Sequence, residues 1–280
     1  MSWNVRNITV RYGHTVAVDE VSFAVEPGHV HSVIGGDGAG KSTLLKVLAG
    51  LDIGQTGTVR LPASNRIGYV PSDGGIFGDL TVDENIEFVA HTYRLRNWRD
   101  RADDLLARAA IGQFGDRIAG RMSGGQRRKL AGCMALLPRP ELLVLDEVTT
   151  GVDPVSRMEL WRLVAGAAAD GAAVVAATTY LDEAERTEEV LLLHDGRVLA
   201  AGPPASVVAS VPGRVHTLDQ PSEPGNAWRS GRRWRQWSPA TDGPFHADLT
   251  LEDAAIVLEL RSADAAAQPS PHTSRQDTPS

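Results

Sequence analysis

The chain has 280 residues, of which 42% are hydrophobic, and a formal net charge of -7. This length and composition allow one or two domains with a buried core, and the negative charge argues against a dominant polyanion-binding role. The longest apolar stretch, residues 165–181, is interrupted by Gly166, Asp170 and Gly171, so we expect neither a transmembrane segment nor a signal peptide. The single cysteine, Cys133, excludes an internal disulfide and suits a reducing compartment.

A glycine-rich segment follows the first strands of the chain. Residues 3–25 are predicted to form strands, and a Pro27-Gly28 turn leads to another strand at residues 29–34. The next helix is predicted to begin near Lys41, so the intervening glycines can point successive amides into one concavity at the positive end of the helix dipole. We expect a polyphosphate there, with Lys41 between its β- and γ-phosphates and Ser42 on Mg²⁺. The candidate nucleotide-binding residues are Gly35, Gly36, Asp37, Gly38, Ala39, Gly40, Lys41, Ser42 and Thr43.

A helical subdomain is predicted at about residues 84–137, where strand patterns are weak and helical periodicity is present. Near its end the sequence reads MSGGQ, and Ser123 is expected to cap a helix whose apolar face includes Cys133, interpreted as a buried small hydrophobe. The amino end of this helix is a second anion site. Because one pocket rarely needs two phosphate cradles, we expect it to bind the γ-phosphate of ATP held by another protomer, in a head-to-tail pair. The residues concerned are Ser123, Gly124, Gly125 and Gln126.

An acidic pair ends the uninterrupted aliphatic run at residues 142–145, which is typical of a central parallel strand buried on both faces. Carboxylates at the carboxyl end of such a strand face the ligand crevice. Asp146 is therefore expected to hold the metal ion through water, and Glu147 to polarise the water that attacks the γ-phosphate.

These three motifs, in this order, resemble the ATP-binding subunit of ATP-binding cassette (ABC) transporters over about residues 3–212. The SGGQ signature is the most specific part of the match. The resemblance implies an ATPase that uses ATP and Mg²⁺. It also implies an α/β fold: a P-loop NTPase core with an antiparallel β subdomain, the helical subdomain and a small C-terminal appendage.

Other positions are assigned through the resemblance alone. Tyr12 matches the aromatic that stacks on adenine; the alternative is a strand aromatic packed in a sheet. Asp153 matches a residue that crosses the dimer interface; the alternative is a turn before a helix with Pro154 at its first position. Residues 76–88 and 180–186 are most similar to the exporter branch, which moves drugs, lipids or polysaccharides outward.

Two positions depart from the family pattern. Ser72 stands where a glutamine is usual, and its hydroxyl is too short to span from its loop to Mg²⁺ and water, although Asp73 beside it is a candidate substitute. Thr179 replaces the histidine that senses the γ-phosphate. We therefore expect slow hydrolysis at this chain's own site, because losing one preorganised contact to a developing charge costs about 100- to 1000-fold in rate.

The intact signature implies partners. It would complete the site of a second ATP-binding subunit, so an asymmetric heterodimer is favoured over a homodimer. Separate integral membrane subunits would dock on the region around residues 72–87, which places the chain peripherally on the cytoplasmic face of the plasma membrane.

One alternative is a regulatory module that binds ATP without turnover, against which the retained Glu147 argues. Soluble cassette ATPases acting on ribosomes or DNA usually carry two cassettes or a long coiled-coil insert, and neither is present here.

The last third of the chain contains a hairpin at residues 191–201, a proline-rich linker at residues 220–225 and a final helix opened by a capping box at Thr250 and Asp253. Residues 228–237 interleave tryptophans with arginines. Nucleic acid or anionic lipid would suit that pattern, but we prefer arginines stacking on tryptophans across a short sheet, with no nucleic-acid partner. The predicted domains are an ATP-binding domain at 1–213, a small C-terminal domain at 214–262 and a disordered tail at 263–280.

Overall fold

The computed structural model describes residues 2–239 and 248–267. The chain forms two compact units, Met1–Val207 and Val208–Ser280, whose boundary lies within the short helix α7 (Pro204–Ala209). The sequence-based division at residue 213 falls shortly after this boundary.

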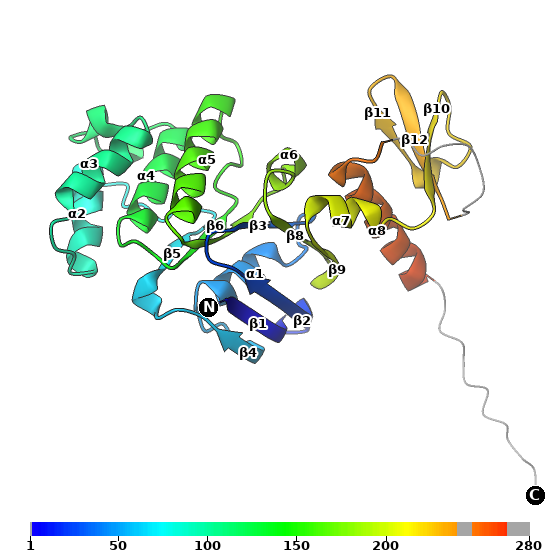
Figure 1. The fold of residues 1–280 in the computed structure, drawn as a ribbon, viewed down its shortest axis with the longest axis horizontal. Helices are drawn as coiled ribbons and strands as arrows, with labels where there is room; N and C mark the ends of the chain where they lie inside the picture. Colours follow the sequence, from blue (N-terminus) through cyan, green and yellow to red (C-terminus); the bar gives the residue numbers. More distant parts are fainter. Residues whose placement is uncertain (1, 240–247, 268–280) are drawn as a thin grey trace, which may run out of the picture. The chain divides into compact units, whose positions relative to one another are not determined.

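Six strands form the central sheet of the first unit: β3 (Val30–Ile34), β5 (Ile67–Val70), β6 (Leu142–Asp146), β7 (Ala173–Ala177), β8 (Glu189–His194) and β9 (Arg197–Gly202). Their order across the sheet is β5-β6-β7-β3-β8-β9 (Figure 1). The first five in this order are parallel to one another, and β9 closes one edge as the antiparallel partner of β8. The predicted hairpin at residues 191–201 is therefore present, and its turn consists of Asp195 and Gly196. The carboxyl ends of β3, β6 and β7 meet at one edge, where parallel sheets place their ligand crevice.

Strand β6 contributes to hydrophobic cores on both faces of this sheet. Leu142 and Val144 pack into the core on one face of the sheet, called here the lower core. Leu143 and Leu145 pack into the core on the other face, called the upper core. Side chains of a strand alternate between faces, so a strand covered on both faces must be apolar at every position. This explains the uninterrupted aliphatic run before Asp146.

A second, antiparallel sheet covers the lower core. It has the order β2-β1-β4 and comprises β1 (Trp3–Tyr12), β2 (Thr15–Val25) and β4 (Thr56–Arg60). Helix α1 (Lys41–Leu48) contacts both β2 and the central strands β6 and β7, so its apolar residues lie between the two sheets. The predicted antiparallel β subdomain corresponds to this layer.

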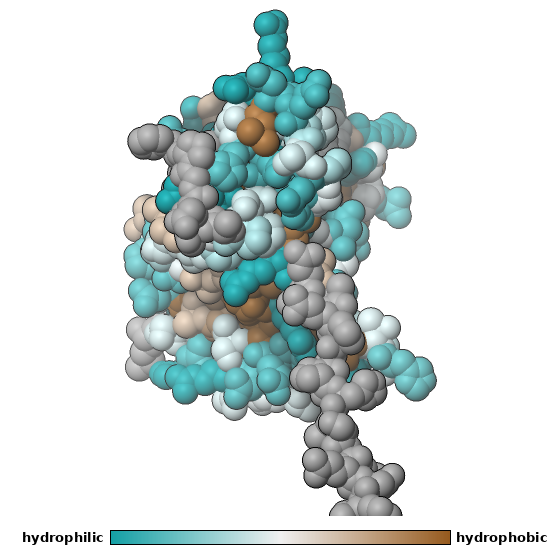
Figure 2. All heavy atoms as spheres, turned by 90° about the vertical axis from the view of Figure 1, so that its right-hand side faces the viewer, coloured by the Kyte–Doolittle hydropathy of each residue, from teal (hydrophilic) through white to brown (hydrophobic). Residues whose placement is uncertain are grey.

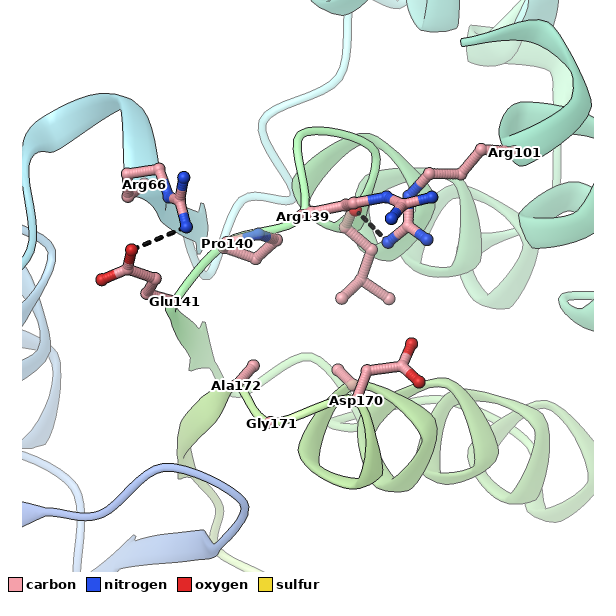
Figure 3. A pocket seen from close by; sticks show the side chains of 10 residues that line it. Arg66, Arg101, Arg139, Pro140, Glu141, Asp170, Gly171 and Ala172 are labelled. Carbon is pink, nitrogen blue, oxygen red and sulfur yellow. Dashed lines mark hydrogen bonds and ion pairs between the residues drawn. The ribbon is translucent and has the colours of Figure 1, made fainter. Parts of the chain in front are cut away.

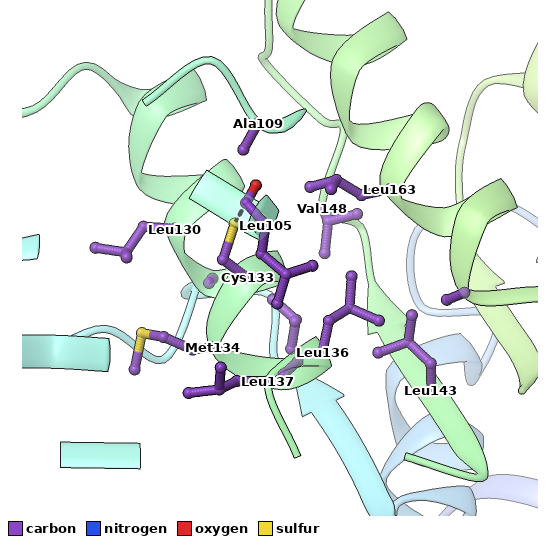
Figure 4. Close-up of a cluster of buried hydrophobic side chains, with 14 of the residues drawn as sticks. Leu105, Ala109, Leu130, Cys133, Met134, Leu136, Leu137, Leu143, Val148 and Leu163 are labelled. Carbon is purple, nitrogen blue, oxygen red and sulfur yellow. Dashed lines mark hydrogen bonds between the residues drawn. The ribbon is translucent and has the colours of Figure 1, made fainter. Parts of the chain in front are cut away.

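The upper core is covered by helices α2 (Val82–Thr92), α3 (Arg99–Arg108), α4 (Gly124–Leu136) and α5 (Pro154–Ala169). Figure 4 shows the apolar side chains gathered around α4, including Leu130 and Met134 from that helix and Leu105 from α3. Cys133 is fully buried there and its thiol donates to the carbonyl oxygen of Leu105 at 3.5 Å. Burial raises the pKa of this thiol to about 12, so the interpretation of Cys133 as a buried hydrophobe is confirmed.

The second unit is a three-stranded antiparallel sheet with one long helix. The elements are β10 (Arg214–Leu218), β11 (Ala227–Ser230), β12 (Arg233–Ser238) and α8 (Leu251–Ala267), with sheet order β10-β12-β11. Val215, Trp237 and Val257 form its small core.

Asp253 is a polar contact between this sheet and α8. It accepts from the Trp228 indole at 3.0 Å, pairs with Arg235 and completes the predicted capping box with Thr250. Arg229 lies 5.5 Å from the Trp234 ring centroid. These tryptophans and arginines therefore contact one another and Asp253 within the second unit, in agreement with the structural interpretation favoured from the sequence.

Helix α8 corrects one expectation. It extends to Ala267, so residues 263–267 belong to a helix and not to the predicted tail. Residues 263–267 contain no aliphatic side chain larger than that of alanine, which is typical of a disordered tail, but alanine has the highest helix propensity of all residues. Residues 268–280 lie outside the described residues.

Among the described residues, no helix combines the length and apolarity that crossing a membrane requires. The face of the molecule in Figure 2 is covered mainly by hydrophilic residues, with hydrophobic residues visible only in small areas.

Truncating Leu130 tests the role of the upper core. Because the side chain has no exposed surface, we expect Leu130→Ala to lower the free energy of unfolding by about 2–5 kcal/mol, through lost burial and a residual cavity. Val155→Ala is the matched control, since that side chain is 61% exposed, and it should change stability by less than about 0.5 kcal/mol. Urea unfolding of the two variants measures both values, and equal effects would contradict this account of the core.

Candidate functional site

The phosphate loop joins β3 to α1 and depends on two glycines that allow close backbone contacts. Gly35 and Gly40 have φ values of 148° and 99°, which side chains of L-residues rarely adopt. A Cβ atom at Gly35 would lie 2.2 Å from the carbonyl oxygen of Leu193, and one at Gly40 would lie 2.3 Å from that of Ala17. The loop therefore packs backbone to backbone against its neighbours, which fixes its concave shape.

Lys41 links this loop to the acidic residue after β6. Its ammonium is almost completely buried and donates to the carbonyl oxygens of Gly35 at 2.9 Å and Gly36 at 3.0 Å. The same nitrogen lies 3.4 Å from a carboxylate oxygen of Glu147. Glu147 has a φ of 52°, an uncommon conformation for a non-glycine residue, and its N–H donates to the carbonyl oxygen of Ala177 in β7 at 3.1 Å. The tertiary fold thus holds this carboxylate next to the loop.

Asp146 is buried at the end of β6 and accepts a hydrogen bond from the Ser42 hydroxyl at 2.9 Å. Desolvation by burial raises the pKa of Asp146, although the hydrogen bond from Ser42 opposes that shift. The two residues predicted to hold a metal ion are therefore direct neighbours, and they present oxygen atoms only, which hard divalent cations prefer.

A cleft of about 310 Å³ lies over the loop. It brings together several residues predicted from the sequence, including Ser72 and Glu147. Its lining residues are Ala17, Asp37, Gly38, Ala39, Gly40, Lys41, Ser42, Thr43, Ser72 and Glu147. Asp73 is not among them, and its carboxylate accepts from the N–H of Gly75 at 3.2 Å.

Tyr12 and Thr179 do not line this cleft. Tyr12 ends strand β1 with its side chain 49% exposed, so it is not an aromatic packed in a sheet. Thr179 follows β7 and is also exposed.

The SGGQ segment begins α4 with a reciprocal cap. The Ser123 hydroxyl accepts from the N–H of Gln126 at 3.2 Å, and the Gln126 side chain accepts from the N–H of Ser123 at 3.0 Å. Gly125 lies against the start of α5, since a Cβ there would be 3.0 Å from the Ser156 hydroxyl and 3.4 Å from Asp153. Asp153 caps α5 through the N–H groups of Val155 and Ser156, and these hydrogen bonds lower its pKa. The turn before a helix with Pro154 at its first position is thus present, which neither tests nor excludes a role at a dimer interface.

A buried carboxylate that the sequence did not reveal fixes the chain near Thr179. Glu183, in the short helix α6 (Leu181–Ala184), is 2% exposed and accepts from the hydroxyls of Thr149 at 2.8 Å and Thr178 at 2.6 Å. Arg157 of α5 donates to it at 2.9 Å and lies 4.2 Å from the Tyr180 ring centroid. The residues after β6 and β7 are thereby connected to α5. In the sequence, Glu183 stands in an acidic run that is typical of an exposed helix, so no local signal marks it as buried.

A phosphate loop between a central parallel strand and a helix, with a carboxylate pair at the end of a neighbouring strand, defines a P-loop nucleotide-binding protein. Comparison with known proteins makes this more specific. The family model described as "ABC transporter" matches residues 18–150. A probable multidrug ABC transporter ATP-binding protein, YbhF of Escherichia coli strain K12, is 36% identical over 266 residues, covering 89% of this chain but 45% of the relative. The chain therefore spans less than half the length of that relative.

Two further comparisons cover most of both chains. The Nod factor export ATP-binding protein I of Ralstonia nicotianae is 33% identical over 218 residues, which are 73% of this chain and 68% of the relative. The solved structure of a dimeric bacterial ABC transporter cassette has a TM-score of 0.64 at 26% identity and covers 72% of this chain and 98% of that one. The chain belongs to the family of ABC transporter ATP-binding proteins, whose members are transport ATPases. The predicted α/β P-loop fold is confirmed, and the relatives' names agree with the exporter resemblance.

Replacing Asp146 tests the electrostatic strain at the site. A carboxyl group whose pKa is raised on folding destabilises the fold while it is ionised, and this cost disappears as the pH falls through the folded-state pKa. We expect Asp146→Asn to raise the melting temperature at neutral pH, without nucleotide or metal, and this gain to shrink in acid. Asp37→Asn is the control, because Asp37 is exposed in the phosphate loop and should show no such gain. A loss of stability in Asp146→Asn at neutral pH would contradict the assignment.

A double-mutant cycle tests the Glu183 cluster. Arg157→Gln leaves a buried carboxylate without its cation, so we expect a loss of about 3–5 kcal/mol in the free energy of unfolding. The double variant Arg157→Gln/Glu183→Gln removes both charges and should recover much of that loss. Urea unfolding of Arg157→Gln, Glu183→Gln and the double variant gives the coupling energy between the two side chains. Additive effects of the two single substitutions would show that the ion pair is energetically unimportant.

Proposed function

We propose that this chain binds and hydrolyses ATP and powers an ABC-type exporter through separate membrane subunits, with slow turnover at its own site. The observation that carries the proposal is the cleft in which the phosphate loop faces Glu147. The family relationship supports the same conclusion, and the relatives' names for multidrug transport and Nod factor export favour outward transport.

ATP would enter with its polyphosphate in the loop of residues 35–43. Loop amides and the start of α1 favour negative charge there, and Lys41 supplies a full positive charge. In the ligand-free chain that charge is shared with Glu147, so phosphate binding would draw the ammonium away from the carboxylate. The adenine would stack on Tyr12, whose exposed ring is available for this contact.

Ser42 and Asp146 fit a Mg²⁺ ion, because they are two adjacent oxygen donors and the remaining ligands would come from phosphate and water. The ion would neutralise charge on the phosphates. Glu147 would accept a proton from the attacking water, and Lys41 would stabilise charge on the transferred group.

Ser72 and Thr179 make the site slow in this proposal. Ser72 lines the cleft, but its hydroxyl is short, and Thr179 lacks an imidazole and lies outside the cleft lining. The signature residues 123–126 and Asp153 would instead serve the ATP of a different, hydrolysing partner in a head-to-tail heterodimer. The dimeric ABC transporter cassette of known structure supports the pairing of two cassettes.

The region around residues 72–87 is the proposed docking surface for the membrane subunits. Phe77 lies in this region and Phe88 follows it directly; they are 43% and 47% exposed, and their ring centroids are 4.5 Å apart. Such an exposed aromatic pair suits an apolar segment of a partner. The chain would then be held peripherally on the cytoplasmic face of the plasma membrane.

Steady-state ATPase activity of the purified chain tests the proposal, with Glu147→Gln as the matched variant and ATP binding and dimer mass recorded in parallel. Tight ATP binding with slow turnover that Glu147→Gln abolishes is the expected result. Rapid turnover by the chain alone would contradict the slow site. Binding without any turnover, even with membrane subunits and a second cassette present, would favour the alternative of a regulatory module.

Restoring the two usual residues gives a sharper prediction. If Ser72 and Thr179 limit hydrolysis, the double variant Ser72→Gln/Thr179→His should raise kcat by about 100-fold or more, since each restored contact to developing charge is worth about 100- to 1000-fold and two need not add. The control is the same double variant with Glu147→Gln, which should remain inactive. An unchanged kcat in the restored variant would show that another step limits turnover.

A further inference from the structure

A cavity of about 550 Å³ lies at the opposite edge of the central sheet from the phosphate loop. Glu141 and Ala172, which line it, precede β6 and β7, whereas Glu147 follows β6. The last turns of α4 and α5 complete the walls, and Figure 3 shows the side chains around the opening. The cavity and the nucleotide cleft therefore lie at opposite ends of β6 and have no lining residue in common.

Two arginines lie side by side on one wall. Arg101 of α3 donates to the carbonyl oxygens of Leu136 at 2.9 Å and Leu137 at 3.2 Å, which caps the end of α4. Arg139 projects from the loop after α4 toward the same place (Figure 3). Burial and the nearby charge of Arg139 lower the pKa of Arg101. Neither guanidinium forms an ion pair among the described residues, and the charge of Arg139 opposes that of Arg101, although the carboxylates of Asp170 and Asp104 partly offset this effect.

The backbone fixes the position of Arg139. It has a φ of 56°, lies between Pro138 and Pro140, and its N–H donates to the carbonyl oxygen of Leu136 at 3.1 Å. A non-glycine residue in this conformation is strained, and such strain persists only where the surroundings impose it. Because the prolines restrict the loop, little backbone entropy remains to be lost when a ligand binds.

The other walls carry negative charge. Asp170 lies at the end of α5, across the cavity from the two arginines, and its charge raises the pKa of Arg101 although it forms no ion pair among the described residues (Figure 3). At the side, Arg66 pairs with Glu141 at 2.6 Å and is thereby neutralised. The cavity thus has a cationic wall that faces the Asp170 carboxylate, whose oxygens can accept hydrogen bonds.

We propose that this cavity binds a small phosphorylated polyol, of the sugar phosphate class, with its phosphate between Arg101 and Arg139 and its hydroxyl groups donating to Asp170. Planar guanidinium groups bind phosphate oxygens bidentately, and adjacent ones share the charge of a dianion. The cavity volume lies within the range of about 300–1,000 Å³ that is usual for small-molecule sites. This ligand would be additional to ATP and would occupy a separate site.

Calorimetric titration of the full chain tests the site, with ribose 5-phosphate and inorganic phosphate as the two probes. We expect saturable binding of ribose 5-phosphate, weakened about tenfold or more in Arg139→Gln, because a charge-assisted contact to the phosphate is lost. Arg96→Gln is the matched control: Arg96 is an exposed arginine outside the cavity, and its replacement should leave affinity unchanged. Lys41→Ala separates the two phosphate sites, since it should weaken binding only at the phosphate loop.

Asp170→Asn distinguishes the two halves of the proposed ligand. Removing its charge should strengthen binding of inorganic phosphate, which gains nothing from the carboxylate, and reduce the preference for ribose 5-phosphate over phosphate. Absence of saturable ribose 5-phosphate binding, equal affinities in Arg139→Gln and Arg96→Gln, or loss of all binding in Lys41→Ala would each overturn the proposal. An unchanged preference in Asp170→Asn would overturn the sugar phosphate assignment.

Discussion

The burial of β6 on both faces is the constraint on which the rest of the structure depends. Its alternate residues belong to two different cores, so only one register of this strand in the sheet places every side chain in its proper core. A slip of one residue would exchange the side chains between the two cores and move Asp146 and Glu147 away from the phosphate loop. The same packing that stabilises the sheet therefore places both carboxylates at its ligand-binding edge.

The charges at that edge are arranged for a ligand and not for stability alone. Asp146 is buried although burial opposes its ionisation. The ammonium of Lys41 donates hydrogen bonds to two backbone carbonyl oxygens and forms an ion pair with Glu147. A protein under no functional constraint would gain by replacing such groups with apolar ones. Under the proposed function, a bound polyphosphate with its cation would offset these unfavourable interactions, so nucleotide binding would raise the stability of the unit.

Local sequence patterns predicted much of this molecule, because the relevant features are local in physical terms. The phosphate loop, the end of β6, the cap at Ser123 and the hairpin through Asp195 each follow from residues within a short segment. Convergence of distant segments could not be predicted in this way. Glu183 is buried only because β7, α5 and the loop after β6 meet around it. Arg101 and Arg139 come from separate elements and no periodicity connects them. The end of α8 was missed for another reason, since alanine extends a helix without needing a core.

The burial of Cys133 has a practical consequence for experiments on this protein. It is the one thiol in the chain, it has no exposed surface, and its high pKa leaves almost no thiolate at neutral pH. Maleimide and methanethiosulfonate reagents react with thiolates, so the folded wild-type chain should remain unlabelled. A cysteine introduced at an exposed position outside the cleft, such as Arg96, would accept a spin label or a fluorophore selectively. Distances between such probes can then be followed through a nucleotide cycle without first removing a native cysteine from the core.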